Sequence, residues 1–304
     1  MTQRKYVVGL GEALYDIFET GPVLGGAPLN VAAHAHQVLA QSDGDGVVYT
    51  RVGEDTFGRR LRDALHDRGM LVEYVQTDPK RETGRVLVTL DAGEPSYEIV
   101  EDVAWDALEM TEDGAQLATH CAAVCFGSLA QRSGQSRRCI QAFVGAAGQA
   151  LRLFDVNLRQ HYYSADVLRE SLQLASATKL NQVEMREVCR LLDLGEGEPI
   201  DLAQRLREMF ELQFVALTRG AEGTSLITSD GMLDGEPQSY PKAENADNVG
   251  AGDACAAGLL AGFILGMPPE KTLSLANHLG AYVASQPGAT PRLPAELVEM
   301  AGGN

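Results

Sequence analysis

Short apolar runs alternate with segments of helical apolar spacing along most of the chain. The runs predict β-strands at residues 6–10, 47–52, 122–127, 151–156, 177–181 and 214–220. The segments between and after them predict helices at residues 28–40, 56–69, 134–149, 165–175, 182–192 and 200–211. Strands that alternate with helices form parallel sheets covered on both faces, so the pattern predicts an α/β fold.

One region breaks this alternation. Residues 83–91 and 95–102 alternate in polarity and are joined by Ala92-Gly93-Glu94, so they predict an antiparallel hairpin. A small sheet outside the main one would cover a site as a lid or form a contact between subunits. Since the chain has no internal repeat and no long linker, we expect a single domain over residues 1–304 with this hairpin as an appendage.

Composition narrows the possible partners. Of the 304 residues 45% are hydrophobic, which is ample for a core, and the formal net charge of −17 argues against nucleic acid and anionic membranes as partners. The five cysteines include no C-x-x-C pair, and the longest apolar stretch, around residues 254–267, is too short to span a membrane. The N-terminal residues are too acidic for a signal peptide, so we expect a cytoplasmic protein with reduced thiols.

Polar side chains follow three of the predicted strands at their carboxyl ends, where open α/β sheets bind ligands. They are Asn157 and Arg159, Asn181 and Glu184, and Thr218 and Arg219. Any one of them fits ordinary turn or cap chemistry. The coincidence of three predicts a ligand site at this edge of the sheet.

The stretch DNVGAGDAC, residues 247–255, places an acid behind a Gly-Ala-Gly step and ahead of an apolar run rich in Ala and Gly. A helix that starts near Ala251–Asp253 would leave the N–H groups of Gly250 to Asp253 free to bind an anion. Asp253 would stay ionised there and could accept a proton from a hydroxyl that attacks a phosphoryl group. The alternative is that Asp253 is an ordinary N-cap, which leaves the glycines unexplained.

Two other glycine motifs differ in how strongly they indicate a ligand site. Gly9 and Gly11 follow the first predicted strand, but Leu14 stands where a dinucleotide-binding motif needs a glycine, and the chain contains no P-loop. In LGGAPLN, residues 24–30, paired glycines and a proline precede a helix with Asn30 in its first turn. The glycines let a ligand approach the backbone closely, although a plain tight turn explains them equally well.

GGAPLN and DNVGAGDACAAGLLAG resemble the two signatures of the ribokinase/PfkB carbohydrate kinase family. Further similar segments follow in the family's order at residues 52–61, 97–106, 154–159, 179–184, 217–223 and 285–291. GEALYD, AWD, FGSLAQRS and SQPGATP are most similar to the fructokinase-like branch. The resemblance implies a three-layer αβα sandwich with a mainly parallel central sheet. It also implies a small β-sheet lid, formed by residues about 12–24 and 83–102, that often pairs two subunits.

The resemblance also implies roles for individual residues, carried over by position. Asp253 corresponds to the catalytic base, and Gly250, Ala251 and Gly252 correspond to the anion hole. The sugar side comprises Asp16, Gly25, Gly26, Asn30, Tyr97 and Arg159. The nucleotide side comprises Asn181, Thr218, Arg219, Gly220, Gly223 and Asn277, with Glu184 organising Mg²⁺ through water. Asp247, with backbone carbonyls near Val249 and Gly288, resembles a site for a monovalent cation such as K⁺.

Two positions depart from the family pattern: Asn248 stands where threonine is usual, and Cys255 where a bulky aromatic is frequent. The resemblance implies a sugar kinase that uses ATP and Mg²⁺, dimerises through the lid, and takes fructose as the expected acceptor. One alternative is a 2-keto-3-deoxygluconate kinase, in which Arg159 would hold the substrate carboxylate. A more remote alternative is a non-catalytic sugar-binding or regulatory relative, which would have lost the base or the glycines.

Overall fold

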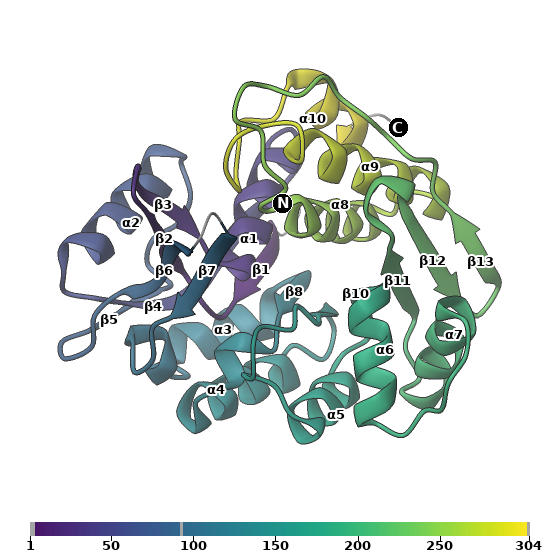
Figure 1. Cartoon of the computed structure of the whole chain (residues 1–304), viewed down its shortest axis with the longest axis horizontal. Helices are drawn as coiled ribbons and strands as arrows, with labels where there is room; N and C mark the ends of the chain where they lie inside the picture. The colour runs from purple at the N-terminus through teal and green to yellow at the C-terminus, as the bar shows by residue number, and fades with distance from the viewer. Residues whose placement is uncertain (1–3, 92–93, 303–304) are drawn as a thin grey trace.

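The computed structural model describes residues 4–91 and 94–302, and within them a nine-stranded sheet runs through the molecule (Figure 1). Its strand order is β13-β12-β11-β10-β9-β8-β1-β4-β5. The strands are β1 (Lys5–Leu10), β4 (Gly44–Gly53), β5 (Val75–Asp78), β8 (Ala123–Phe126), β9 (Leu151–Asp155), β10 (Ala177–Asn181), β11 (Phe214–Thr218), β12 (Thr224–Thr228) and β13 (Gly231–Asp234). Neighbours pair in parallel from β5 to β11, and only β12 and β13 pair antiparallel. The predicted α/β class with a mainly parallel sheet is confirmed.

Helices cover both faces of this sheet (Figure 1). One face carries α1 (Ala27–Val38), α8 (Ala251–Leu265), α9 (Pro269–Val283) and α10 (Ala295–Gly302), with α2 (Thr56–Asp67) packed beside α1 over β4. The other face carries α3 (Glu112–His120), α4 (Gly134–Ala146), α5 (Ala165–Leu174), α6 (Gln182–Leu191) and α7 (Pro199–Met209). No helix of the described segments is both long and apolar enough to cross a membrane.

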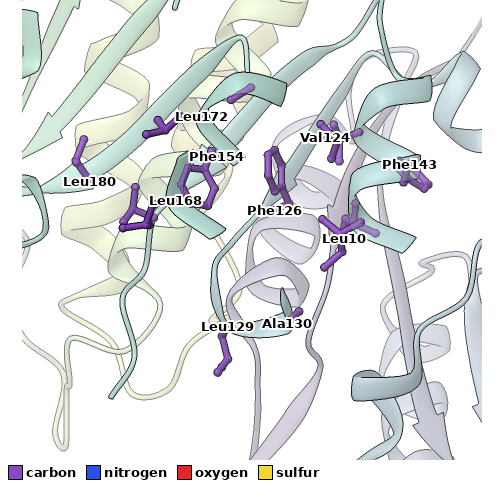
Figure 2. Close-up of a cluster of buried hydrophobic side chains, with 14 of the residues drawn as sticks. Leu10, Val124, Phe126, Leu129, Ala130, Phe143, Phe154, Leu168, Leu172 and Leu180 are labelled. Carbon is purple, nitrogen blue, oxygen red and sulfur yellow. The ribbon is translucent and has the colours of Figure 1, made fainter. Parts of the chain in front are cut away.

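The core divides into two halves because the strands are apolar on both faces. On β9, Leu153 packs among α8 and α9 while the adjacent Phe154 packs on the α4–α5 side. Figure 2 shows this second side, where Phe154 and Phe126 lie between the helical residues Leu168, Leu172 and Phe143. Alternate side chains therefore pack against the helical layers on opposite faces of the sheet. This packing on both faces makes the sheet a rigid support for residues at its carboxyl edge.

Helix α1 lies unusually close to the sheet. A Cβ atom on Gly9 would be 1.9 Å from the Pro28 carbonyl oxygen, and one on Gly46 would be 1.9 Å from the Ala32 carbonyl oxygen. Only glycine permits this approach. Gly9 is thus a packing residue beneath α1, in line with the rejection of a dinucleotide motif, and it brings the start of α1 to the carboxyl end of β1.

A separate four-stranded sheet has the order β3-β2-β6-β7 and consists of β2 (Leu14–Phe18), β3 (Gly21–Gly25), β6 (Gly84–Asp91) and β7 (Glu94–Ile99). β6 and β7 pair antiparallel, so the predicted hairpin is confirmed, although Ala92 and Gly93 of its turn lie outside the described residues. β2 and β3 fall in the segment expected to join it.

All six predicted strands and six predicted helices of the main domain are present with ends shifted by a few residues. The strand expected to reach residue 220 ends at Thr218, because a 3₁₀ turn begins at Gly220 with a positive φ of 59°. The pattern failed to predict α3, α9 and α10, and β5, β12 and β13. These are short, edge or weakly periodic elements.

Candidate active site

The three strands that carry the predicted polar ends are direct neighbours. β9, β10 and β11 are adjacent in the sheet order and parallel, so their carboxyl ends meet at one edge. Arg159 follows β9, Glu184 follows β10, and Thr218 ends β11. The site begins from this edge and is completed by the first turns of α1 and α8.

The start of α8 has the geometry of an anion site. Gly250 is the N-cap, in the left-handed conformation with φ 79° and ψ −5°, and no side chain caps the helix. A Cβ there would lie 2.3 Å from the Ala289 carbonyl oxygen, so only glycine fits. In the described part of the chain the N–H groups of Gly252 and Asp253 make no backbone hydrogen bond, which leaves them free for an anion.

Asp253 is therefore the third residue of α8, and the alternative that it is an N-cap is wrong. Its carboxylate is buried, and its Oδ2 accepts a hydrogen bond of 2.8 Å from the Asn30 amide, in the first turn of α1. Two segments 223 residues apart meet at this contact. The Asn30 Oδ1 atom is buried without a partner in the described residues, so one polar atom beside this carboxylate is free for a ligand.

Burial controls the ionisation of Asp253. The pKa is raised from 3.8 to about 6, because burial and the nearby Asp155 charge together outweigh the Asn30 hydrogen bond and the charges of Lys179 and Arg159. Desolvation thus moves the pKa toward neutrality although the carboxylate lies in the first turn of a helix. A pKa near 6 still leaves it mostly ionised at neutral pH and makes it a stronger base.

The sugar-side residues Asp16, Gly25 and Gly26 lie together beside Glu12. A Cβ on Gly25 would be 2.9 Å from Asp16 Oδ2, and one on Gly26 would be 2.6 Å from the Glu12 carbonyl oxygen. Burial raises the pKa of Asp16 to about 6, and the positive charge of Arg159 opposes that shift. The Arg159 charge thus lies close enough to act on both Asp16 and Asp253.

Glu12 is a site residue that the sequence reasoning missed. Its side chain is only 4% exposed, and its Oε2 atom has no hydrogen-bond partner in the described residues. Burial, together with the Asp253 charge, raises the pKa of Glu12 to about 7. The Arg159 charge and a hydrogen bond from the Ala27 N–H act in the opposite direction. An isolated acid directly after a buried apolar strand was the available signal, and only the glycines around it were considered.

The small sheet contacts the loop after β9, which carries Arg159. The Gln160 amide donates a 2.7 Å hydrogen bond to the Tyr97 carbonyl oxygen, and the Tyr162 hydroxyl donates to the Ile99 carbonyl oxygen at 3.3 Å. The Tyr97 side chain, expected on the sugar side, is 53% exposed. Its backbone lies beside the loop that carries Arg159, so β7 is next to the predicted sugar-side residues.

A cavity of about 570 Å³ lies against the first turns of α8. Four of the predicted nucleotide residues line it, Thr218, Gly220, Gly223 and Asn277, together with Ala251 and Gly252 of the anion site and the unusual residues Asn248 and Cys255. Arg219 does not line it, because its guanidinium pairs with Asp234 at 3.0 Å. The cavity has the size and the glycine-rich backbone that a nucleotide requires.

Asn181 and Glu184 form a capping box at the start of α6. Asn181 Oδ1 accepts the N–H groups of Val183 and Glu184, while Glu184 Oε2 accepts the Asn181 N–H at 2.9 Å. Glu184 Oε1 accepts the Leu158 N–H at 3.1 Å. Each carboxylate oxygen keeps a lone pair, so Glu184 can still accept a hydrogen bond from a water bound to Mg²⁺.

A buried ion pair lies directly behind the glycines. Lys179 of β10 and Asp155 of β9 are neighbours in the sheet register, and Lys179 Nζ lies 2.7 Å from Asp155 Oδ1 with both side chains at most 5% exposed. A Cβ on Gly252 would be 3.5 Å from the same Nζ, so this cation adds positive potential to the anion site. Both charged residues lie within apolar strands, which could have predicted a buried ion pair. The strand prediction did not use this observation.

Asp247 joins the two loops expected to hold a monovalent cation. Its Oδ1 accepts the Val249 N–H at 2.9 Å and its Oδ2 accepts the Gly288 N–H at 3.0 Å. Carboxylate and carbonyl oxygens are the donors that a hard cation prefers. The structure thus brings all three predicted residues together beside the anion site.

The chain matches the pattern of the pfkB family carbohydrate kinases over residues 10–296. It is 30% identical to a fructokinase of Klebsiella pneumoniae, with 94% of this chain and 95% of that protein covered. The structure is similar to that of a fructokinase with bound ATP from Xylella fastidiosa, with a TM-score of 0.84, 21% identity and 98% of both chains covered. It is also similar to an uncharacterized sugar kinase of Pyrococcus horikoshii, with a TM-score of 0.81, 26% identity, and 98% of this chain and 99% of that one covered.

Proposed function

This chain belongs to the pfkB family of carbohydrate kinases, and from that premise we propose that it transfers the γ-phosphate of ATP to a hydroxyl of fructose. The single observation that carries the proposal is the Asn30–Asp253 contact of 2.8 Å at the start of α8. It places a buried carboxylate of raised pKa near Glu12 and Arg159, on a helix whose first turn lines the nucleotide-sized cavity. Phosphoryl transfer from a nucleotide in that cavity to a hydroxyl needs a base at that point.

The proposed chemistry assigns one task to each group. Asp253 accepts the proton of the acceptor hydroxyl, whose oxygen attacks the γ-phosphorus, and the bond to the β-phosphate oxygen breaks to release ADP. The N–H groups of Gly252 and Asp253, with the Lys179 charge behind them, stabilise the negative charge on the transferring group. Mg²⁺ bound to the ATP phosphates supplies charge neutralisation, and Glu184 would hold its water shell. We also propose K⁺ at Asp247, where it would steady the loop before α8.

The charges of the acceptor pocket favour a neutral sugar. Three carboxyl groups, Glu12, Asp16 and Asp253, share the charge of one guanidinium, Arg159. A sugar acid would bring a fourth carboxylate into this field, whereas the hydroxyls of a neutral sugar can donate to the free carboxylate oxygens. The similarity to fructokinases supports fructose among the neutral sugars.

One observation supports the alternative acceptor, 2-keto-3-deoxygluconate. Arg159 is exposed, and its guanidinium bonds only the Leu158 carbonyl and Asn157 Oδ1 in the described residues, so it retains donors for a carboxylate. An ADP-release assay with Mg-ATP and fructose, 2-keto-3-deoxygluconate, ribose or adenosine separates these possibilities. The proposal is supported if kcat/KM is highest with fructose. If kcat/KM is highest with 2-keto-3-deoxygluconate, that sugar acid is the acceptor instead of fructose. Sugar binding without turnover would indicate a regulatory relative.

We further propose that the four-stranded sheet acts as a lid and pairs two subunits. The exposed apolar side chains of Val23 and Tyr97, on β3 and β7, lie on this sheet and support a contact surface. Its hydrogen bonds to the loop after β9 support movement together with the acceptor pocket. Sedimentation equilibrium of the wild type against a Val23→Lys variant tests the pairing; an unchanged mass of one subunit for both contradicts it.

A further inference from the structure

His34 is a completely buried histidine to which the proposed reaction assigns no task. It lies on α1 four residues after Asn30, so both side chains leave the same face of the helix. Asn30 contacts the proposed base, Asp253. His34 reaches a different segment, at the far side of the anion site.

The His34 Nε2 atom lies 2.9 Å from the Ala289 carbonyl oxygen. A carbonyl can only accept, so Nε2 carries the proton and donates. Burial lowers the pKa of His34 to about 4, which keeps the ring neutral and this tautomer fixed. Its other nitrogen, Nδ1, has no partner in the described residues, so a single hydrogen bond orients the ring.

Ala289 is the residue against which Gly250 packs. A Cβ on Gly250 would lie 2.3 Å from the Ala289 carbonyl oxygen and 2.8 Å from its Cα. The oxygen that His34 holds is therefore the atom that limits the position of the first anion-site glycine. A shift of that carbonyl would move Gly250, and with it the N–H groups that follow it.

The remainder of segment 286–291 is tied down elsewhere. Gly288 donates to Asp247, the Arg68 guanidinium donates to the Thr290 carbonyl at 3.3 Å, and the Gln37 amide donates to the Pro291 carbonyl at 3.2 Å. Among these bonds, His34 supplies the one at the point of contact with Gly250. Gln37, on the same helix, supplies a comparable bond two residues farther along.

We infer that His34 is a positioning residue for phosphoryl transfer: it holds the Ala289 carbonyl against Gly250 and so aligns the anion-site N–H groups with the base that Asn30 holds. The inference rests on the proposed function for its catalytic consequence. Helix α1 then orients both halves of the reaction centre, the base through Asn30 and the anion site through His34. A misalignment of this kind weakens stabilisation of the transition state more than ground-state binding.

The test compares the kcat of three variants, and their KM values for Mg-ATP and for the sugar, with those of the wild type. His34→Leu removes the donor at similar volume and is expected to lower kcat at least tenfold with each KM changed less than threefold. His34→Gln places an amide donor near the position of Nε2 and is expected to recover most of the lost kcat. Gln37→Leu, the matched control, removes a bond to the same segment away from Gly250 and is expected to keep kcat within twofold of the wild type. His34→Asn, too short to reach Ala289, replaces the leucine variant if that one does not fold.

A second readout does not depend on turnover. Hydrogen–deuterium exchange of His34→Leu is expected to rise in peptides covering residues 247–256 and 284–291, whereas Gln37→Leu raises it only around residues 290–293. A kcat for His34→Leu within twofold of the wild type, or no recovery with glutamine, overturns the inference. Unchanged exchange over residues 247–256 also overturns it. If the wild type phosphorylates no sugar, the proposed function fails, and the exchange result alone decides the role of His34.

Discussion

Replacing Asp253 with asparagine should abolish catalysis and stabilise the fold. Asparagine has the same shape, and its Oδ1 can still accept the Asn30 hydrogen bond. It cannot take a proton from a hydroxyl, so kcat should fall by about 10²–10⁴-fold or more. The ionised carboxylate is costly when buried, and the neutral amide removes that cost.

The magnitude follows from the pKa of Asp253. Burial raises it from 3.8 to about 6 in the fold. One pKa unit corresponds to about 1.4 kcal/mol, so two units correspond to up to about 3 kcal/mol. Since the folded pKa is above the unfolded one, the ionised group destabilises the fold fully above pH ~6, and the effect disappears below pH ~4. Asp253→Asn should therefore raise the free energy of unfolding by about 1–3 kcal/mol at pH 8, and raise Tm by several degrees.

The assay is thermal unfolding by circular dichroism at pH 8 and pH 4, beside the ADP-release assay. Asp67→Asn is the control, because the Asp67 side chain is 84% exposed and should change neither stability nor turnover. The reasoning is refuted if Asp253→Asn is less stable than the wild type at pH 8. It is also refuted if the gain at pH 4 equals the gain at pH 8, or if turnover stays within tenfold of the wild type.

Further substitutions test other parts of the site. Gly252→Ala should fold, since its Cβ would lie 3.5 Å from the nearest atom outside its own helix, but it should lose turnover because the methyl group enters the phosphoryl position. Gly250→Ala should lower Tm, since its Cβ would lie 2.3 Å from a carbonyl oxygen. Lys179→Met should cost about 3–5 kcal/mol in urea unfolding by leaving Asp155 unpaired, with most of it recovered on adding Asp155→Leu. Arg159→Lys should lower kcat/KM for 2-keto-3-deoxygluconate more than for fructose, and equal losses would remove carboxylate recognition. The kcat/KM of the wild type should fall about tenfold per pH unit below about pH 6, where Asp253 becomes protonated, and a flat profile down to pH 5 would contradict its role as the base.

Hydrophobic periodicity predicted the main sheet because its central strands are buried on both faces and alternate strictly with helices. The two edge strands, β5 and β13, lacked that signal, since each has only four residues and is partly exposed. The pattern also missed β12, a strand of five residues next to the edge. Helix α9 went unpredicted although its buried residues Leu273, Ala276 and Leu279 recur at helical spacing. The parallel register of β9 to β11 explains why three separate polar ends could be expected at one edge.

The candidate site could be predicted where short motifs carry the chemistry, and not where long-range packing does. Asp253 and its glycines form one continuous stretch, so their spacing was informative. The contact of Asp253 with Asn30, the Lys179–Asp155 pair and the bond from His34 to Ala289 join residues far apart in the sequence. The raised pKa of Asp253 likewise depends on burial, which no local pattern reports.

The most direct test of the account is the rate of ADP release by the wild-type protein with Mg-ATP and each of the four candidate acceptors. The account predicts turnover that depends on an added sugar, with the highest kcat/KM for fructose. A folded protein that releases no ADP with any of them would contradict the assignment of Asp253 as the base of a sugar kinase acting on these acceptors.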